Sequence, residues 1–213
     1  MSTSASAPAA GSSSVHPVRH WTYSLLQLAT RRRIAISFVL FTSLIVADLL
    51  LWQTRPCDLF NLLDPSTILG ELLIVSGILL RTWAAGTIRK SKTLTMSGPY
   101  ELVRNPLYVG SFLLMFGFAV LLRDWIAMWV FLGPILAMYL NKVRQEEIYL
   151  ARNFPEVWPE YAEQTPRYFP HFDRLPSLGG FSWQQWTSNH EYHVIGASLL
   201  GLMAIWGWHR AMG

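Results

Sequence analysis

Residues 97–110 read SGPYELVRNPLYVG and mark the point where a basic loop runs into an apolar segment. Pro106 suits the first turn of a helix, where its missing N–H is no loss, and Asn105 before it is a natural N-cap. Arg104 and Tyr108 place a guanidinium and a phenol beside this helix start, and such groups are costly at the lip of a bilayer without a role. The stretch therefore predicts a helix that begins at Pro106 and one half of a binding pocket.

The composition indicates a membrane protein. Of the 213 residues, 52% are hydrophobic and 14% are charged, against roughly 25% charged in soluble domains. The bases do not form an aromatic-interleaved patch, which argues against nucleic acid as a partner. Cys57 is the single cysteine, so an internal disulfide and a cysteine-based metal site are excluded. The six histidines are scattered along the chain, and we expect no metal site.

Five apolar stretches are candidates for crossing a bilayer, which takes about 20 apolar residues. They are Ile34–Trp52, Ser66–Ala85, Leu107–Leu122, Trp125–Leu140 and His193–Trp208. The third and fourth are separated only by Arg123 and Asp124, which predicts an antiparallel helical hairpin. The predicted fold is all-α, a polytopic membrane helix bundle with about five transmembrane helices and a cytoplasmic cofactor-binding segment.

The parts between these stretches define the domain organisation. We expect residues 1–30 to be a disordered cytoplasmic tail and residues 31–213 to be the membrane domain. Lys and Arg gather before the first span, in 86–106 and in 141–192. By the positive-inside rule these segments lie in the cytoplasm. Within 141–192 the fourth helix should continue to Asn153, because Pro155 cannot occupy a helix interior.

A second motif, RQEE at residues 144–147, follows the fourth stretch on the same predicted side. Adjacent helix positions are about 100° apart, so Glu146 and Glu147 point to different faces. Glu146 forms an i,i+4 pair with Lys142, and a solvated helix end explains it without a function. Glu147 is the better candidate for a functional residue, because it lies on the predicted buried face of the helix. That face also holds Leu140, Val143, Arg144 and Leu150.

Three further charges, Asp48, Glu71 and Arg81, fall within predicted spans. Glu71 and Arg81 are too far apart to meet on one straight helix, since ten residues span about 15 Å. Each charge therefore needs a partner elsewhere or must extend to the interface.

Four runs together resemble the isoprenylcysteine carboxyl methyltransferase family, whose core is shared by the phospholipid N-methyltransferases. They are GILLRTWAAGT at 77–87, SGPYELVRNPLYVG at 97–110, EEIYL at 146–150 and PRYFP at 166–170. The resemblance covers about residues 70–170 and leaves 193–209 as an extra C-terminal helix. Asn105 departs from the family, where many relatives have His, and Pro155 and Trp158 depart as well.

The resemblance implies an integral-membrane methyltransferase with S-adenosylmethionine in a cytoplasm-facing pocket. The implied cofactor-binding residues are Tyr100, Val103, Arg104, Asn105, Pro106, Tyr108, Gly110, Glu146, Glu147 and Tyr161. The implied catalytic residues are Arg104, Arg144 and Glu147.

The expected reaction is methylation of a lipophilic or lipidated acceptor in an inner or plasma membrane. Carboxyl O-methylation of an isoprenylcysteine-like group is the first choice, and N-methylation of a phospholipid or other amine is the alternative. A non-enzymatic small membrane protein with a cytoplasmic docking segment is the competing hypothesis.

Overall fold

The computed structural model describes residues 54–89, 93–170, 176–177 and 179–212, with the single helical positions Val39, Ser43 and Val46. The predicted tail 1–30 and Asp48 lie outside the described residues, as does the first predicted span apart from those three positions. The described part of the chain is all-α, without a strand. Its helices are α3 (Pro65–Thr87), α4 (Pro99–Leu102), α5 (Pro106–Leu122), α6 (Trp125–Asn153), α7 (Trp158–Gln164), α8 (Trp183–Ser188) and α9 (Tyr192–Ala211).

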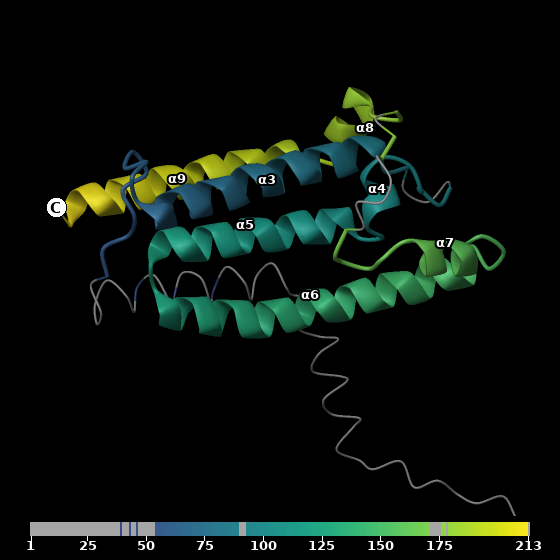
Figure 1. Ribbon diagram of the computed structural model, residues 1–213, viewed down its shortest axis with the longest axis horizontal. Coiled ribbons are helices and arrows are strands. Elements are labelled where there is room, and N and C mark those ends of the chain that lie inside the picture. The colour runs from purple at the N-terminus through teal and green to yellow at the C-terminus, as the bar shows by residue number, and fades with distance from the viewer. Residues whose placement is uncertain are drawn as a thin grey trace, which may run out of the picture.

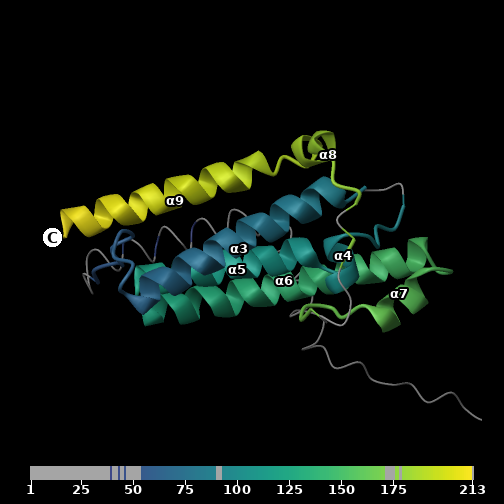
Figure 2. The same cartoon turned by 45° about the horizontal axis from the view of Figure 1, so that its top comes forward.

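The four long helices α3, α5, α6 and α9 lie alongside one another, and α4, α7 and α8 gather at one end of them (Figure 1). We call this the short-helix end. Helices α3 and α6 run toward it and α5 and α9 run away from it, so the C-terminus lies at the opposite end. The turned view keeps α9 beside α3 and α6 beside α5 (Figure 2). The chain therefore brings residues 97–110 and 144–147 to the same end of the bundle.

Helices α3 and α5 pack backbone to backbone through four glycines. Each helix carries two of them, seven residues apart. A Cβ added at Gly77 would lie 2.8 Å from the carbonyl oxygen of Gly110, and one added at Gly110 would lie 2.9 Å from that of Gly77. Gly117 and Gly70 repeat this arrangement at 2.8 and 3.1 Å. Small residues allow such close approach between membrane helices, and side chains at these positions would push the helices apart.

The predicted hairpin is confirmed. Helix α5 ends at Leu122, Arg123 takes a left-handed conformation (φ 56°) at its C-cap, and α6 begins at Trp125. Arg123 also forms an ion pair with Asp64, the N-cap of α3. Helix α6 continues without a break to Asn153, as the position of Pro155 predicts.

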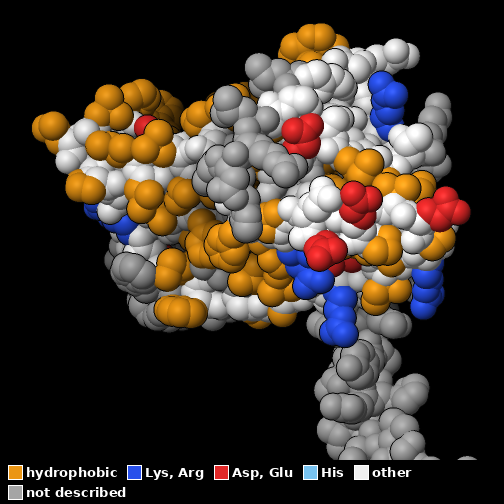
Figure 3. Space-filling model, turned by 45° about the vertical axis from the view of Figure 1, so that its right-hand side comes forward, with side chains coloured by type: hydrophobic (Ala, Val, Ile, Leu, Met, Phe, Trp, Pro, Cys, Tyr) orange, Lys and Arg blue, Asp and Glu red, His pale blue; other side chains and the backbone are white. Residues whose placement is uncertain are grey.

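Membrane crossing is supported most directly for α3, the one described helix that is both long and apolar enough to span a bilayer. Helix α5 is apolar but shorter, with 17 residues. The number of five spans stays a prediction. The space-filling view shows apolar side chains over much of the long-helix region, with charged side chains mainly toward the short-helix end (Figure 3).

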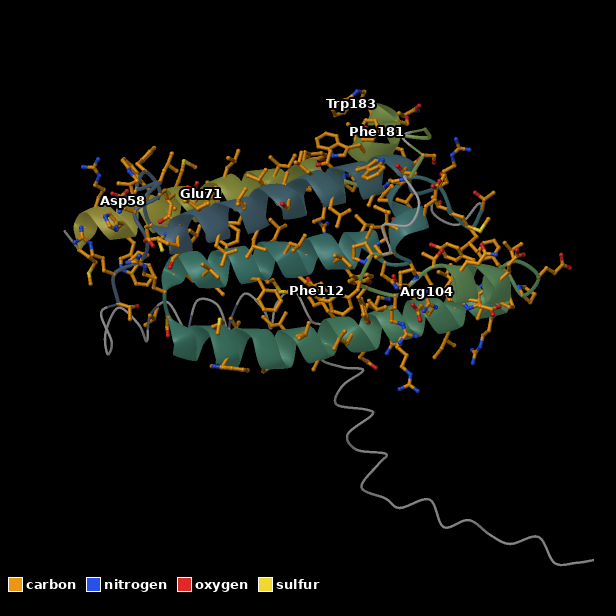
Figure 4. All side chains as sticks on the ribbon, viewed as in Figure 1. Asp58, Glu71, Arg104, Phe112, Phe181 and Trp183 are labelled. Atoms are coloured by element: carbon orange, nitrogen blue, oxygen red, sulfur yellow. The ribbon has the colours of Figure 1, made fainter. Side chains whose placement is uncertain are left out.

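The segment after α7 packs over the end of α3. The Ser182 N–H donates to the Gly86 carbonyl oxygen at 2.9 Å, and the Asn189 side chain donates to that of Ala85 at 2.8 Å. These bonds satisfy carbonyls that a helix C-terminus leaves unpaired. Phe181 lies so close that a Cβ at Gly86 would meet its ring at 2.2 Å. Trp183 is 68% exposed beside it (Figure 4).

Candidate functional site

The two predicted halves of the pocket meet at Glu147, which is only 6% exposed. The Asn105 side-chain amide donates to its Oε1 at 3.0 Å. The Arg167 guanidinium donates to Oε2 through Nε at 2.9 Å and through Nη2 at 2.6 Å. Arg104 Nη1 lies 3.7 Å from Oε1. One buried carboxylate thus joins α6 to the start of α5 and to the segment after α7, and its hydrogen bond raises the pKa of Arg167.

Asn105 occupies the predicted N-cap position of α5, but its side chain makes no capping hydrogen bond. The side-chain NH2 donates to the Glu147 carboxylate, and a hydrogen bond to a charged acceptor is stronger than one to a neutral acceptor. Sequence reasoning located the residue correctly and missed its partner.

Besides its contact with Glu147, Arg104 makes two contacts that hold it in place. Its backbone N–H donates to the Pro166 carbonyl at 2.8 Å. Its guanidinium carbon lies 5.8 Å from the centre of the Trp158 ring, within range of a cation–π interaction. Its Nε–H is buried and has no hydrogen-bond partner among the described atoms. A charged donor is therefore held in place with one N–H unused; Figure 4 shows Arg104 at the short-helix end.

Tyr100 provides a second unpaired donor. Its backbone carbonyl accepts a hydrogen bond from the Tyr161 hydroxyl at 2.8 Å, which ties α4 to α7. Its own hydroxyl is buried and makes no hydrogen bond within the described part of the chain. Burial is the main cause that raises the pKa of Tyr100, with smaller contributions from Tyr161 and Glu146. The phenol therefore stays protonated and can donate a hydrogen bond.

Glu146 lies in a different environment from its neighbour. Its side chain is 42% exposed. It accepts a hydrogen bond from the Tyr108 hydroxyl at 2.8 Å, and Lys142 lies 3.5 Å away, as the i,i+4 spacing predicts. The Tyr108 ring packs edge-on against Tyr139, with centroids 5.8 Å apart, and Phe112 contacts Tyr139 at 6.0 Å. Aromatic rings thus separate α5 from α6 directly beside this carboxylate.

Four predicted site residues lie outside the side-chain contacts around Glu146 and Glu147. Val103 and Pro106 are buried in the wall that carries Arg104. Gly110 faces α3, where an added Cβ would meet Arg81 Cγ at 2.5 Å. The assignment of Arg144 to the buried face is wrong, because the residue is exposed. It is three positions before Glu147 and lies about 60° to the side of it on the helix, toward solvent.

The structure adds residues that the sequence did not place in the site. Arg167 of the PRYFP run matches the family's pattern but was not among the predicted cofactor-binding or catalytic residues, and the structure gives it a contact with Glu147. Arg81 forms a two-point ion pair with Glu191, with Nε–Oε1 at 2.6 Å and Nη2–Oε2 at 3.0 Å. Of the two alternatives for Arg81, a partner beyond its own helix or extension to the interface, the structure shows the first. The signal was its charge within an apolar span, and spacing alone did not identify Glu191.

Across the described residues, no group of three His, Cys, Asp or Glu side chains could hold a metal ion.

Comparison with known proteins agrees with this architecture. The model of the phospholipid methyltransferase family matches residues 65–157. The cobalt-zinc-cadmium resistance protein CzcN of Cupriavidus metallidurans is 35% identical over 169 residues, which are 78% of this chain and 75% of that protein. The nickel-cobalt-cadmium resistance protein NccN of Alcaligenes xylosoxydans xylosoxydans is 36% identical over 115 residues, 51% of each chain. No solved structure gives a significant match.

The chain therefore belongs to the phospholipid methyltransferase family, the membrane methyltransferases related to the isoprenylcysteine carboxyl methyltransferases. This confirms the resemblance inferred from the motifs. The matched region includes Glu146, Glu147 and residues 97–110, and it ends before Tyr161, Arg167 and Glu191.

Proposed function

We propose that this protein is an S-adenosylmethionine-dependent methyltransferase of the membrane that acts on a lipophilic acceptor. The observation that carries the proposal is the pair of buried, unpaired donors in the wall of the site, the Tyr100 hydroxyl and Arg104 Nε. A buried polar group without a partner costs about 1–3 kcal/mol, so two of them beside a charged cluster favour a ligand with acceptor groups.

The residues present fit the cofactor. It offers a carboxylate and a ribose for donors such as Arg104 and Tyr100, and an ammonium for an acidic acceptor such as Glu146. The Tyr108 and Tyr139 rings supply aromatic faces that favour a positive charge. When bound, S-adenosylmethionine supplies a methyl group on a sulfonium, which is a good leaving group. The protein then needs to align the acceptor and exclude water.

The charges in the site favour a carboxylate acceptor. Glu147 is paired by Asn105, Arg104 and Arg167, so it is poorly available as a general base. Methylation of a carboxylate requires no base, and Arg104 can orient such an acceptor. We therefore propose O-methylation of a lipophilic carboxylate, of the isoprenylcysteine type.

One observation favours N-methylation as the second candidate. Glu146 is partly exposed and is held by Tyr108. An amine acceptor must lose a proton, and a positioned carboxylate can accept it.

Ligand binding tests the cofactor assignment. S-adenosylhomocysteine is titrated into detergent-purified protein, with the melting temperature and the binding heat as readouts. We expect a rise in melting temperature that Glu146→Gln weakens. The matched control is Glu160→Gln, a carboxylate on α7 that bonds Gln164, and it should bind like the wild type. No shift in wild-type protein at millimolar ligand would overturn the proposal.

The product distinguishes the two acceptors. Membranes are incubated with methyl-labelled S-adenosylmethionine and total lipid extract, and the labelled lipid is treated with alkali. A methyl ester releases volatile labelled methanol, whereas an N-methyl group retains the label. Retention of all the label would contradict O-methylation and support the amine acceptor.

We place the short-helix end in the cytoplasm, as the positive-inside distribution predicts. The test is labelling by a membrane-impermeant thiol reagent in intact cells. Glu163→Cys on α7 is introduced into a Cys57→Ser background, since Cys57 is the single native cysteine. Protection in intact cells and labelling after lysis are expected, and labelling without lysis would reverse the orientation.

A further inference from the structure

We propose that Glu191, which lies beyond the region matched by the family, is a positioning residue for the candidate site and acts through Arg81. The inference rests on the proposed function for its ligand-binding readout. It makes α9 part of the site's support, although the extra C-terminal helix was expected to stand outside the core.

The ion pair that carries the inference is buried and has two contact points. The side chains of Arg81 and Glu191 are 17% and 5% exposed. Both carboxylate oxygens accept hydrogen bonds from the guanidinium, at 2.6 and 3.0 Å. A planar guanidinium held at two points has a fixed orientation. Glu191 therefore determines where the remaining donor of Arg81 points.

That remaining donor reaches the first turns of α5. Arg81 Nη1 donates to the Leu107 carbonyl at 3.1 Å and to Ser111 Oγ at 2.5 Å. Ser111 Oγ donates in turn to the Leu107 carbonyl at 2.9 Å. Leu107 and Ser111 flank Tyr108, the residue that holds Glu146. The chain of contacts thus runs from Glu191 through Arg81 to the turn of α5 that presents Tyr108.

Two further observations connect this ion pair with the site. Burial, Tyr161 and Glu146 have the largest effects on the pKa of Tyr100. The charge of Arg81 lowers this pKa and that of Glu191 raises it, so both residues lie within electrostatic reach of the unpaired Tyr100 hydroxyl. Asn189, two residues before Glu191, donates to the Ala85 carbonyl near the end of α3. This bond fixes the chain that carries Glu191 to the same helix as Arg81.

Three variants separate positioning from plain stability. Glu191→Gln removes the charge that orients Arg81. The double variant Arg81→Gln with Glu191→Gln replaces the ion pair by a neutral pair, so no buried charge is left uncompensated. Ile205→Ala loosens α9 at a core position, 4% exposed, that lies in the cluster with Ile74 and Leu121.

The readouts are the melting temperature without ligand and the affinity for S-adenosylhomocysteine, measured where each variant is folded. We expect Glu191→Gln to weaken binding about tenfold, because a mutation in a network of contacts typically changes the coupling between its ends by a factor of about 2 to 30. The double variant should recover melting temperature but not affinity, and Ile205→Ala should lose melting temperature but keep affinity. Affinity that follows melting temperature across all three variants would overturn the inference.

Hydrogen exchange keeps this test separate from the proposed function. Without ligand, Glu191→Gln should accelerate exchange of the amides of residues 107–111 relative to both wild type and Ile205→Ala. If wild-type protein binds no S-adenosylhomocysteine, the proposed function fails, and the exchange result still decides the positioning role. Unchanged exchange at 107–111 in Glu191→Gln would overturn the inference whether or not the ligand binds.

Discussion

On the side of α5 that faces α3, backbone meets backbone, whereas on the side that faces α6 the contacts are made by side chains. Gly110 and Gly117 bring α5 against the glycines of α3. Toward α6, the rings of Tyr108 and Phe112 reach Tyr139, and polar groups reach Glu146 and Glu147. The helix thus has a close-packed side and a polar, aromatic side.

The difference indicates how an apolar bundle carries a polar site. Close backbone packing fixes α5 relative to α3 without polar groups. The candidate site lies on the opposite side of α5, where longer side chains hold α5 and α6 further apart. Asn105, Tyr108 and the two carboxylates lie in the space between these helices. The two carboxylates of α6 also differ from each other. Glu147 is buried and paired within the protein, whereas Glu146 is partly exposed.

The largest expected effect is on the α6 side. Glu147→Ala leaves Arg104, whose side chain is 14% exposed, without its carboxylate, and breaking a buried ion pair costs about 3–5 kcal/mol. The pair with Arg167 adds little to this loss, because the Arg167 side chain is 47% exposed. Glu146→Ala should cost less than about 1 kcal/mol, because its ion pair is exposed. Chemical or thermal unfolding in detergent measures both. Equal losses in the two variants would remove the distinction between the adjacent carboxylates.

The close-packed side should respond to a single methyl group. Gly110→Ala puts a Cβ against Arg81 and the Gly77 carbonyl, and overpacking of this kind costs about 1–3 kcal/mol. Gly196→Ala on α9 meets nothing within 4 Å and should stabilise the helix by up to about 1 kcal/mol. The two melting temperatures should therefore shift in opposite directions. A neutral Gly110→Ala would mean that the α3–α5 contact is looser than the distances indicate.

Residue types and local rules predicted much of this arrangement. Pro106 marked the start of α5, Arg123-Asp124 marked the hairpin, and Pro155 marked the end of α6. The two motif halves were placed on one side, and they lie at one end of the bundle. Each of these inferences depends on a local rule, such as a missing N–H at proline or the length of an apolar run.

Partner choice across helices could not be predicted in the same way. Periodicity put Arg144 on the face of Glu147, yet the guanidinium that pairs with Glu147 comes from Arg167, twenty residues further along. The pairing of Arg81 with Glu191 crosses 110 positions. Such contacts depend on how helices rotate and approach one another, and a single sequence carries no local signal for that.

A smaller effect is expected at Tyr108, on the polar side where the proposed cofactor would bind. Tyr108→Phe keeps the ring beside Tyr139 but removes the hydroxyl that holds Glu146. A single hydrogen bond is worth about 0.5–1.5 kcal/mol, so the affinity for S-adenosylhomocysteine should fall several-fold in calorimetric titration. Tyr149→Phe on the outer face of α6, where the residue is 60% exposed, is the matched control. A change in melting temperature with unchanged affinity would assign Tyr108 to packing alone.

The smallest effect lies outside both sides of α5, at Glu101 on α4. Burial raises the pKa of this carboxyl, but hydrogen bonds from Ser177 and from the Gly98 N–H outweigh burial and lower it below its ordinary 4.5. A lowered folded-state pKa contributes stability above the unfolded value, and this contribution is lost as pH falls through the folded value. The melting temperature of wild type should therefore exceed that of Glu101→Gln at pH 7, and the gap should close as pH falls below 4.5. Glu163→Gln, an exposed carboxylate on α7, should show no gap at either pH. A gap for Glu101→Gln that persists in acid would mean that the contact between α4 and Ser177 does not depend on the charge of Glu101.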